Sequence, residues 1–124
     1  MKTKEKISIV GSGYVGLSLG VLLSQENQVT ILDIDIDRVN KVNNSKSTVV
    51  DKEIEDMMSK GELSLSATLD KTEAYRNASY IIIATPTNYD EKTNYFDTSS
   101  IKSCLEEIKK QNHKSTVIIR STIP

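Results

Sequence analysis

The amino-acid sequence predicts an α/β fold in which a parallel sheet of about five strands is covered by helices. Short apolar runs rich in β-branched residues alternate with stretches whose apolar residues recur at helical spacing. One run, YIIIA at residues 80–84, is apolar on both faces, which is typical of a central strand in a parallel sheet. Strands that alternate with helices are joined by right-handed crossovers, so we expect a doubly wound arrangement.

Local patterns set the expected elements. We expect strands at 7–10, 29–32, 63–69, 80–84 and 116–122, and helices at 15–25, 36–44, 51–61, 70–77 and from a cap at Ser99 or Ser100 onward. The strand at 63–69 alternates apolar and polar residues, so it should lie at a sheet edge with one wet face, whereas the last strand should be buried.

Polar residues mark where helices begin and where the chain forms a loop. Asp35 or Asp37 would cap the second helix, and Asp70 with Glu73 would form a capping box. Residues 85–98 are polar and longer than an ordinary connection, so we expect them to form a functional loop.

The composition limits the size of the domain and its partners. The 124 residues, 37% of them apolar, can fill one hydrophobic core. With 16 basic and 17 acidic side chains the net charge is −1, which favours neither nucleic acid nor a membrane surface as a partner. No apolar run approaches the roughly 18 residues of a membrane span. Cys104 is the only cysteine, so an internal disulfide is excluded and a reducing cytoplasm is the simplest compartment.

The stretch IVGSGYVGLSLG at residues 9–20 places a glycine-rich turn between the first strand and the first helix. Gly11 would permit the tight turn, Gly13 would let a pyrophosphate approach the backbone, and Gly16 would let the helix pack closely on the strand. Free N–H groups of the first helical turn would face the phosphates, where the helix dipole favours negative charge. The pattern predicts a dinucleotide-binding unit of the Rossmann type, with a tight turn that binds no ligand as the alternative.

Asp33 ends the second strand 22 residues after Gly11, close to the interval expected for such a unit. Its carboxylate would accept hydrogen bonds from the adenosine ribose and repel a 2′-phosphate, which favours NAD over NADP. The alternative role for Asp33 is a helix cap. Arg38, five residues later, would support the cofactor contact or else be a solvated helix residue.

Hydroxyl groups follow two further strands of the expected sheet. Thr85, Pro86 and Thr87 come directly after the central strand, and Thr122 follows the last strand. Because ligands of open parallel sheets lie beyond the carboxyl ends of the strands, we expect these residues to line one cofactor cleft. The alternative is that the threonines only satisfy the backbone of their own loops.

Five motifs occur together in order: GSGYVGLSLGVLLS, VTILDID, ATPTNY, NYFDT and STIP. Over essentially the whole chain they resemble the N-terminal NAD-binding domain of the UDP-glucose/GDP-mannose dehydrogenase family, and the NYFDT motif favours the members that act on UDP-glucose. The resemblance implies an oxidoreductase that converts UDP-glucose to UDP-glucuronate in two NAD-dependent steps, as used for capsule polysaccharide. The alternatives are a member that acts on GDP-mannose or a UDP-N-acetylhexosamine, and a stand-alone nucleotide-binding module without catalysis.

The resemblance also implies roles for individual residues. The pyrophosphate loop would be Gly11, Ser12, Gly13, Tyr14, Val15 and Gly16, the adenosine-ribose contacts Asp33 and Arg38, and the other cofactor contacts Thr85, Pro86, Thr87 and Thr122. Thr122 would also orient the catalytic water. None of these residues is implied as a metal ligand.

The family's nucleophilic cysteine and its lysine, asparagine and aspartate partners would lie far beyond position 124. We therefore expect residues 1–124 to be an incomplete NAD-binding domain that lacks catalysis and the central helical and C-terminal substrate domains. Cys104 is expected in the core and His113 in a solvated loop, neither with a catalytic role. The strand that starts at Thr116 should expose an edge that pairs with another copy, and the intact protein should be a homodimer.

Overall fold

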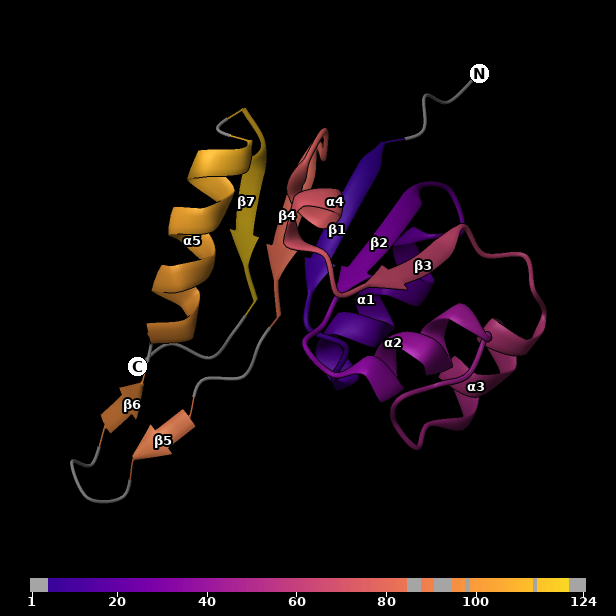
Figure 1. The fold of residues 1–124 in the computed structure, drawn as a ribbon. Coiled ribbons are helices and arrows are strands. Elements are labelled where there is room, and N and C mark those ends of the chain that lie inside the picture. The colour runs from indigo at the N-terminus through magenta and orange to yellow at the C-terminus, as the bar shows by residue number, and fades with distance from the viewer. Residues whose placement is uncertain (1–4, 85–87, 91–94, 98, 113, 121–124) are drawn as a thin grey trace.

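Five parallel strands form the central sheet of the computed structural model, which describes residues 5–84, 88–90, 95–97, 99–112 and 114–120 (Figure 1). The strands are β1 (Lys6–Val10), β2 (Gln28–Leu32), β3 (Leu65–Thr68), β4 (Tyr80–Ile83) and β7 (Thr116–Ile119). Their spatial order is β3-β2-β1-β4-β7, so the chain winds outward in both directions from β1 and β4. The predicted α/β class and the parallel sheet are confirmed.

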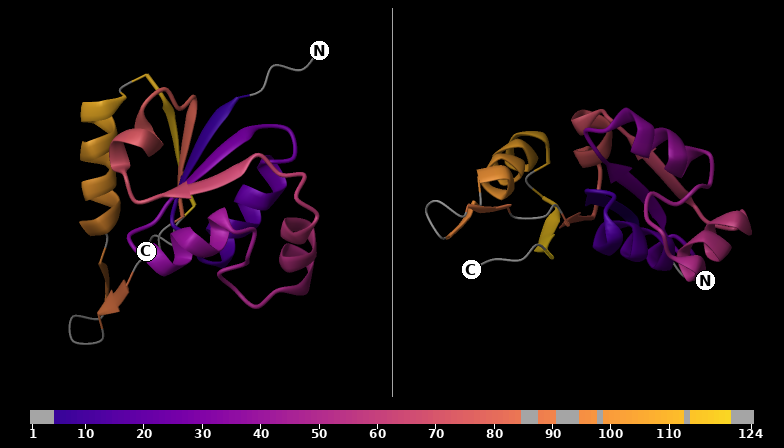
Figure 2. Two further views of the ribbon diagram at one scale, coloured as in Figure 1. Left: turned by 45° about the vertical axis from the view of Figure 1, so that its right-hand side comes forward. Right: turned by 90° about the horizontal axis from the view of Figure 1, so that it is seen from below.

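Two helical layers cover the sheet, and α1 and α4 lie on opposite faces (Figure 2). The helices are α1 (Tyr14–Leu23), α2 (Ile36–Asn43), α3 (Lys52–Ser59), α4 (Lys71–Tyr75) and α5 (Ser99–Gln111). Side chains of β1 alternate between two cores: Ile7 and Ile9 pack in the cluster that includes α1, α2 and α3 residues, and Val10 in the cluster that includes α4 and α5 residues. No helix in the described ranges is long and apolar enough to span a membrane.

The segment expected as one long loop contains a small hairpin. The strands β5 (Asn88–Asp90) and β6 (Tyr95–Asp97) pair antiparallel, with Tyr89 opposite Phe96. The expectation that residues 85–98 form a loop is therefore wrong for these six positions, which are strands. Alternation of apolar and polar residues is too short here to be distinguished from a loop in the sequence.

Three helices begin with an aspartate cap. The carboxylates of Asp35, Asp51 and Asp70 each accept a hydrogen bond from a backbone N–H in the first turn of α2, α3 and α4. Of the two candidates for the cap of α2, the structure selects Asp35 over Asp37. Gly61, with a φ of +68°, follows α3 and confirms the expected stop.

Two predicted helix starts differ in detail. The capping box at Asp70 is only half formed, because Glu73 accepts a hydrogen bond from the Thr68 hydroxyl and the Asp70 N–H donates to that same hydroxyl oxygen. In addition, α4 ends slightly earlier than expected, at Tyr75. Ser99 and its neighbouring serine lie inside the first turn of α5, so the prediction that one of them is the cap is wrong.

One edge of the sheet, β3, is covered by a side chain. The Asn43 amide nitrogen donates to the Ala67 carbonyl at 3.0 Å, and the Asn43 amide oxygen accepts from the Ala67 N–H at 2.8 Å. The predicted edge position of this strand is confirmed. The predicted solvent-exposed face of this strand is wrong at residue 68, because Thr68 is buried and its hydroxyl donates to Glu73 in the first turn of α4. Leu69 lies beyond the strand and is exposed.

The other edge of the sheet is β7, and it is open among the described residues. Thr116, Ile118 and Ile119 are exposed, so the prediction that this strand is buried is wrong. The expectation of an exposed edge on the same strand is confirmed. Only Val117 packs partly against the core, because β7 has β4 as a neighbour on one side and no described strand on the other.

Candidate functional site

A groove of about 510 Å³ opens at the carboxyl ends of β1 and β2. It lies where the direction of winding reverses between β1 and β4, the position at which open α/β sheets bind ligands. One side, the glycine wall, consists of Gly11, Ser12, Gly13, Asp33 and Arg38. The opposite side, the helix wall, consists of side chains from α4 and α5, namely Lys71, Tyr75, Ser103, Cys104 and Glu107.

The turn of the glycine wall depends on two of its glycines. Gly11 has a φ of +104°, a conformation that favours glycine, and its N–H donates to the Leu32 carbonyl at 2.8 Å. A Cβ at Gly16 would lie 2.1 Å from the carbonyl oxygen of Gly11, so any side chain there would displace the helix from the turn. The local geometry therefore agrees with the tight turn and close packing expected of these two positions.

The start of α1 differs from the starts of α2, α3 and α4. Gly13 occupies the cap position, offers no side chain to the first turn, and is followed by no acidic residue in that turn. The first N–H bonded within the helix is that of Leu17, which donates to the Gly13 carbonyl at 2.9 Å. The N–H groups of Gly13, Tyr14, Val15 and Gly16 have no acceptor in the described ranges, which leaves the positive end of the helix dipole beside the groove.

Asp33 joins the end of β2 to the glycine turn. Its Oδ2 accepts hydrogen bonds from the Ser12 backbone N–H at 3.0 Å and from the Ser12 hydroxyl at 2.5 Å. Its Oδ1 accepts one from the Asp35 N–H at 3.0 Å, and the carboxylate is 8% exposed. A carboxylate has about four acceptor positions, so Asp33 retains capacity for a ligand hydroxyl. Its alternative role as a helix cap is wrong, because Asp35 caps α2.

Arg38 lies at the mouth of the groove with its side chain half exposed. Its guanidinium is 4.0 Å from Asp33 Oδ2 and 3.9 Å from Asp35 Oδ2, both at the limit of an ion pair. These long contacts in solvent hold the side chain weakly. Arg38 is therefore free to shift toward a ligand.

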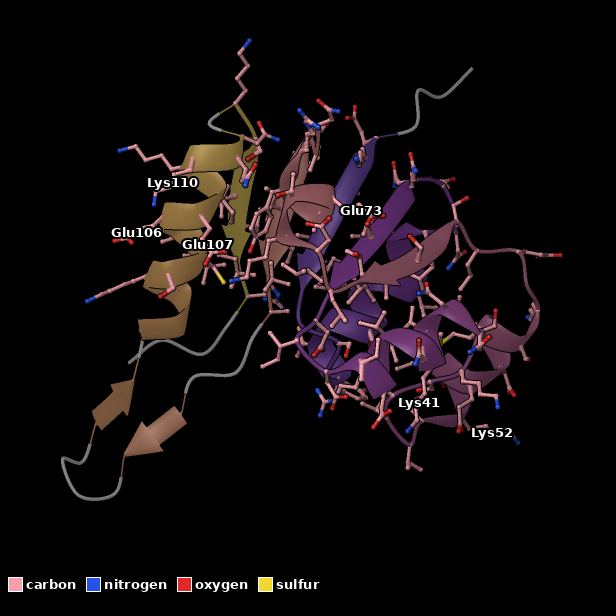
Figure 3. All side chains as sticks on the ribbon, in the orientation of Figure 1. Lys41, Lys52, Glu73, Glu106, Glu107 and Lys110 are labelled. Carbon is pink, nitrogen blue, oxygen red and sulfur yellow. The ribbon has the colours of Figure 1, made fainter. Side chains whose placement is uncertain are left out.

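The helix wall contains an ion pair and a buried phenol. Lys71 Nζ lies 2.9 Å from Glu107 Oε1, which joins α4 to α5. Glu107 is on the side of α5 that faces the sheet, whereas Glu106 and Lys110 point away from it (Figure 3). Burial raises the pKa of the Tyr75 phenol, and the neighbouring Cys104 and Glu107 raise it further.

Cys104 is half-buried and lies beside the Tyr75 hydroxyl. Burial raises the pKa of its thiol, although the Tyr75 hydrogen bond partly opposes that shift. Such a thiol stays protonated near neutral pH and is a poor nucleophile. The expected core position is only partly correct, because Cys104 also lines the groove.

Sequence reasoning missed the helix wall and two apolar residues at the groove. Ile34 follows β2 and is 92% exposed, and Leu69 follows β3 and is also exposed. Each lies one or two positions after a strand, which was a usable signal, since ligands lie beyond the carboxyl ends of parallel strands. Apolar side chains held at this edge offer a surface on which a planar base packs.

The remaining candidate residues fall into two groups. Tyr14 and Val15 are exposed in the first turn of α1, next to the groove. Thr85, Pro86, Thr87, Thr122 and His113 lie outside the described residues. The described residues contain no cluster of His, Cys, Asp or Glu able to hold a metal ion.

Fold and site together define a nucleotide-binding α/β domain of the Rossmann type, with its groove at the reversal point of a parallel sheet. Residues 5–124 match the NAD binding domain of the UDP-glucose/GDP-mannose dehydrogenase family. The chain belongs to this family, and NAD is therefore its cofactor, as expected from the sequence.

Three known proteins show how far the likeness extends. UDP-glucose 6-dehydrogenases of Streptococcus pneumoniae and Campylobacter jejuni are 48% and 50% identical, each over 96% of this chain. The chain spans only 30% and 31% of their lengths. A solved GDP-mannose dehydrogenase of Pseudomonas aeruginosa superposes with a TM-score of 0.85 at 27% identity, covering 94% of this chain and 28% of that protein.

Proposed function

We propose that the chain is the NAD-binding part of a UDP-glucose 6-dehydrogenase, which oxidises UDP-glucose to UDP-glucuronate in two steps. One observation carries the site assignment: the Asp33 carboxylate lies in the same groove as the uncapped start of α1. A group that accepts from ribose hydroxyls is thus joined to a backbone that donates to phosphates. The identity to two UDP-glucose 6-dehydrogenases supports the choice of substrate.

Each part of the glycine wall has a task in this proposal. The N–H groups of Gly13, Tyr14, Val15 and Gly16 donate to the pyrophosphate, and Asp33 accepts from the adenosine ribose. Arg38 moves to the cofactor from its weak contacts with two aspartates. When bound, NAD supplies the hydride acceptor, while these residues only hold and orient it.

The remaining assignments extend beyond the described residues. Thr85, Pro86, Thr87 and Thr122 contact the cofactor on the β4 and β7 side, and Thr122 also orients the catalytic water. The chain is the N-terminal domain, and the nucleophilic cysteine and the sugar site of the intact enzyme lie outside it; the chain spans only 30% and 31% of the lengths of the two relatives. The intact enzyme is a cytoplasmic homodimer whose product supplies polysaccharide synthesis such as that of a capsule.

Calorimetric titration of the chain with NAD, NADP and ADP-ribose tests the cofactor site. We expect NAD and ADP-ribose to bind, and NADP to bind at least about tenfold more weakly, because its 2′-phosphate would face the Asp33 carboxylate. Equal affinity for NAD and NADP would contradict the role of Asp33. No binding of any of the three would leave the glycine turn as a structural feature.

A second candidate substrate is GDP-mannose. The observation that favours it is the close superposition on a GDP-mannose dehydrogenase. The longer protein that contains this chain, assayed by NAD reduction, separates the two: we expect turnover of UDP-glucose and none of GDP-mannose. The reverse result would keep the cofactor site and replace the substrate.

A further inference from the structure

The connection between α2 and α3 contacts the glycine wall from the opposite side to the groove-lining helices. The hydroxyl of Thr48, in this connection, donates a hydrogen bond to the backbone carbonyl of Ser12. The two residues are 36 positions apart in the sequence. Thr48 follows no strand of the sheet, so the rule that places ligand sites at strand ends does not find it.

Ser12 is held at every polar group that it has. Its N–H and its hydroxyl donate to Asp33 Oδ2, and its carbonyl accepts from Thr48. The residue is 1% exposed, so water has little access to these partly buried bonds. The peptide planes on both sides of Ser12 are therefore fixed by partners from two different segments.

The bond from Thr48 determines where the next backbone donor points. In a trans peptide the carbonyl of one residue and the N–H of the next point in opposite directions, and the described chain has no cis peptide. With the Ser12 carbonyl directed at Thr48, the Gly13 N–H points the other way. This N–H has no acceptor among the described residues, and Gly13 lines the groove.

We propose that Thr48 is a positioning residue of the NAD site, which orients the Ser12–Gly13 peptide so that its N–H faces the pyrophosphate. The inference rests on the proposed function, since it assumes that NAD binds at the glycine wall. Thr48 itself does not touch the cofactor. It acts through Ser12 by removing the freedom of that peptide to rotate before the cofactor arrives.

Hydrogen bonds and packing of its two neighbours hold Thr48 in place. The Ser47 hydroxyl donates to the Val49 carbonyl and accepts from the Val49 N–H, which closes a short turn around Thr48. Val49 also packs against the core shared with α1 and α3. The hydroxyl is thus anchored to the rigid part of the fold and not to a free loop.

Three variants test the proposal. Thr48→Val keeps the shape and removes the donor, Thr48→Ser keeps the donor, and Ser115→Ala removes a comparable hydroxyl bond, to the Asn112 carbonyl, away from the groove. We expect Thr48→Val to weaken NAD binding about fivefold, the effect of losing one neutral hydrogen bond. Thr48→Ser and Ser115→Ala should bind NAD as the wild type does. Calorimetry measures the affinities, and urea unfolding measures the stability of each variant.

A second measurement keeps the test decisive if Thr48→Val proves unstable. The ¹⁵N–¹H resonance of Gly13 should shift when NAD binds to the wild type and to Thr48→Ser. Thr48→Ser with weakened affinity and no Gly13 shift, or Thr48→Val with wild-type affinity, would overturn the role of Thr48. Absence of NAD binding by the wild type would overturn the proposed function and this inference with it, so the two failures are distinct.

Discussion

The two walls of the groove are built in different ways. The glycine wall is mostly backbone, and buried hydrogen bonds to Ser12 and Asp33 fix it. The helix wall is made of side chains: its two helices pack together through the buried Ala74, Tyr75 and Ile108, and at the groove they meet in the Lys71–Glu107 ion pair, whose members are 54% and 36% exposed. Solvent screens this ion pair, whereas it has little access to the hydrogen bonds of Ser12, a residue that is 1% exposed.

This difference indicates which part of a ligand each wall is suited to bind. Donors that are already fixed need no reordering when a ligand arrives, so the glycine wall is suited to bind charged phosphates with defined geometry. The exposed side chains of Lys71 and Glu107 adjust at little cost, so the groove face of the helix wall is suited to close over the less polar part of a ligand. Changes to the two walls should therefore differ in both size and kind.

The largest effect is expected for Gly16→Ala in the glycine wall. The new Cβ would lie 2.1 Å from the Gly11 carbonyl oxygen, so α1 must move away from the turn. We expect a loss of about 1–3 kcal/mol in the free energy of unfolding, measured with urea, together with loss of NAD binding.

Gly13→Ala is the matched control for Gly16→Ala. A Cβ there meets no atom within 4 Å, and the φ of −72° suits any residue. The variant should keep its stability and still bind NAD more weakly, because the methyl group lies where the pyrophosphate approaches. Equal stability losses in the two variants would show that the glycine wall is not packed as described.

The next largest effect is expected for Asp33→Asn, which keeps the shape of the side chain and removes its charge. Hydrogen bonds to a charged group are worth more than neutral ones, so we expect NAD affinity to fall about tenfold and the preference over NADP to shrink. Asp51→Asn, at the cap of α3 and outside the groove, is the control. It should change stability slightly and NAD affinity not at all.

Two groups of the helix wall should make the stability of the chain depend on pH in alkaline solution. Tyr75 and Cys104 have raised pKa values in the folded chain, above ordinary values of 10.0 and 9.0. Between the unfolded and folded pKa values the folded chain holds more protons, so stability falls as the pH rises above about 9. The slope is at most about 1.4 kcal/mol per pH unit for each group. Tyr75→Phe should give a shallower slope, and an unchanged slope would assign the effect to other groups.

Lys71→Met should have the smallest effect. It breaks the ion pair with Glu107, but both groups are partly solvated, so the free energy of unfolding should change by less than about 1 kcal/mol. Raising the salt concentration should reduce even this difference between variant and wild type. A larger change that persists in high salt would show that the helix wall is as rigid as the glycine wall.

The sequence predicted those features that depend on neighbouring residues. The strand, the turn at Gly11, the helix and the acid at Asp33 form one continuous stretch whose patterns are local. The contact of Thr48 with Ser12 and that of Asn43 with Ala67 join distant segments through a single polar side chain. Such pairs leave no periodic pattern, because one hydroxyl or amide in a polar connection looks like any other.

Cys104 shows a second limit of the same kind. Its helical spacing with Ile108 correctly placed it on the inner face of α5. The spacing did not reveal that α5 also forms one side of the groove, because that depends on how α5 packs against α4. The direction of a side chain is local information, whereas the cavity it meets is not.

The Asn43 amide on β3 has a consequence for assembly. It occupies the backbone N–H and carbonyl groups of Ala67 on the outer edge of this strand, so a strand of another copy finds no free partner at that position. Pairing at this edge would first have to displace the amide from both groups.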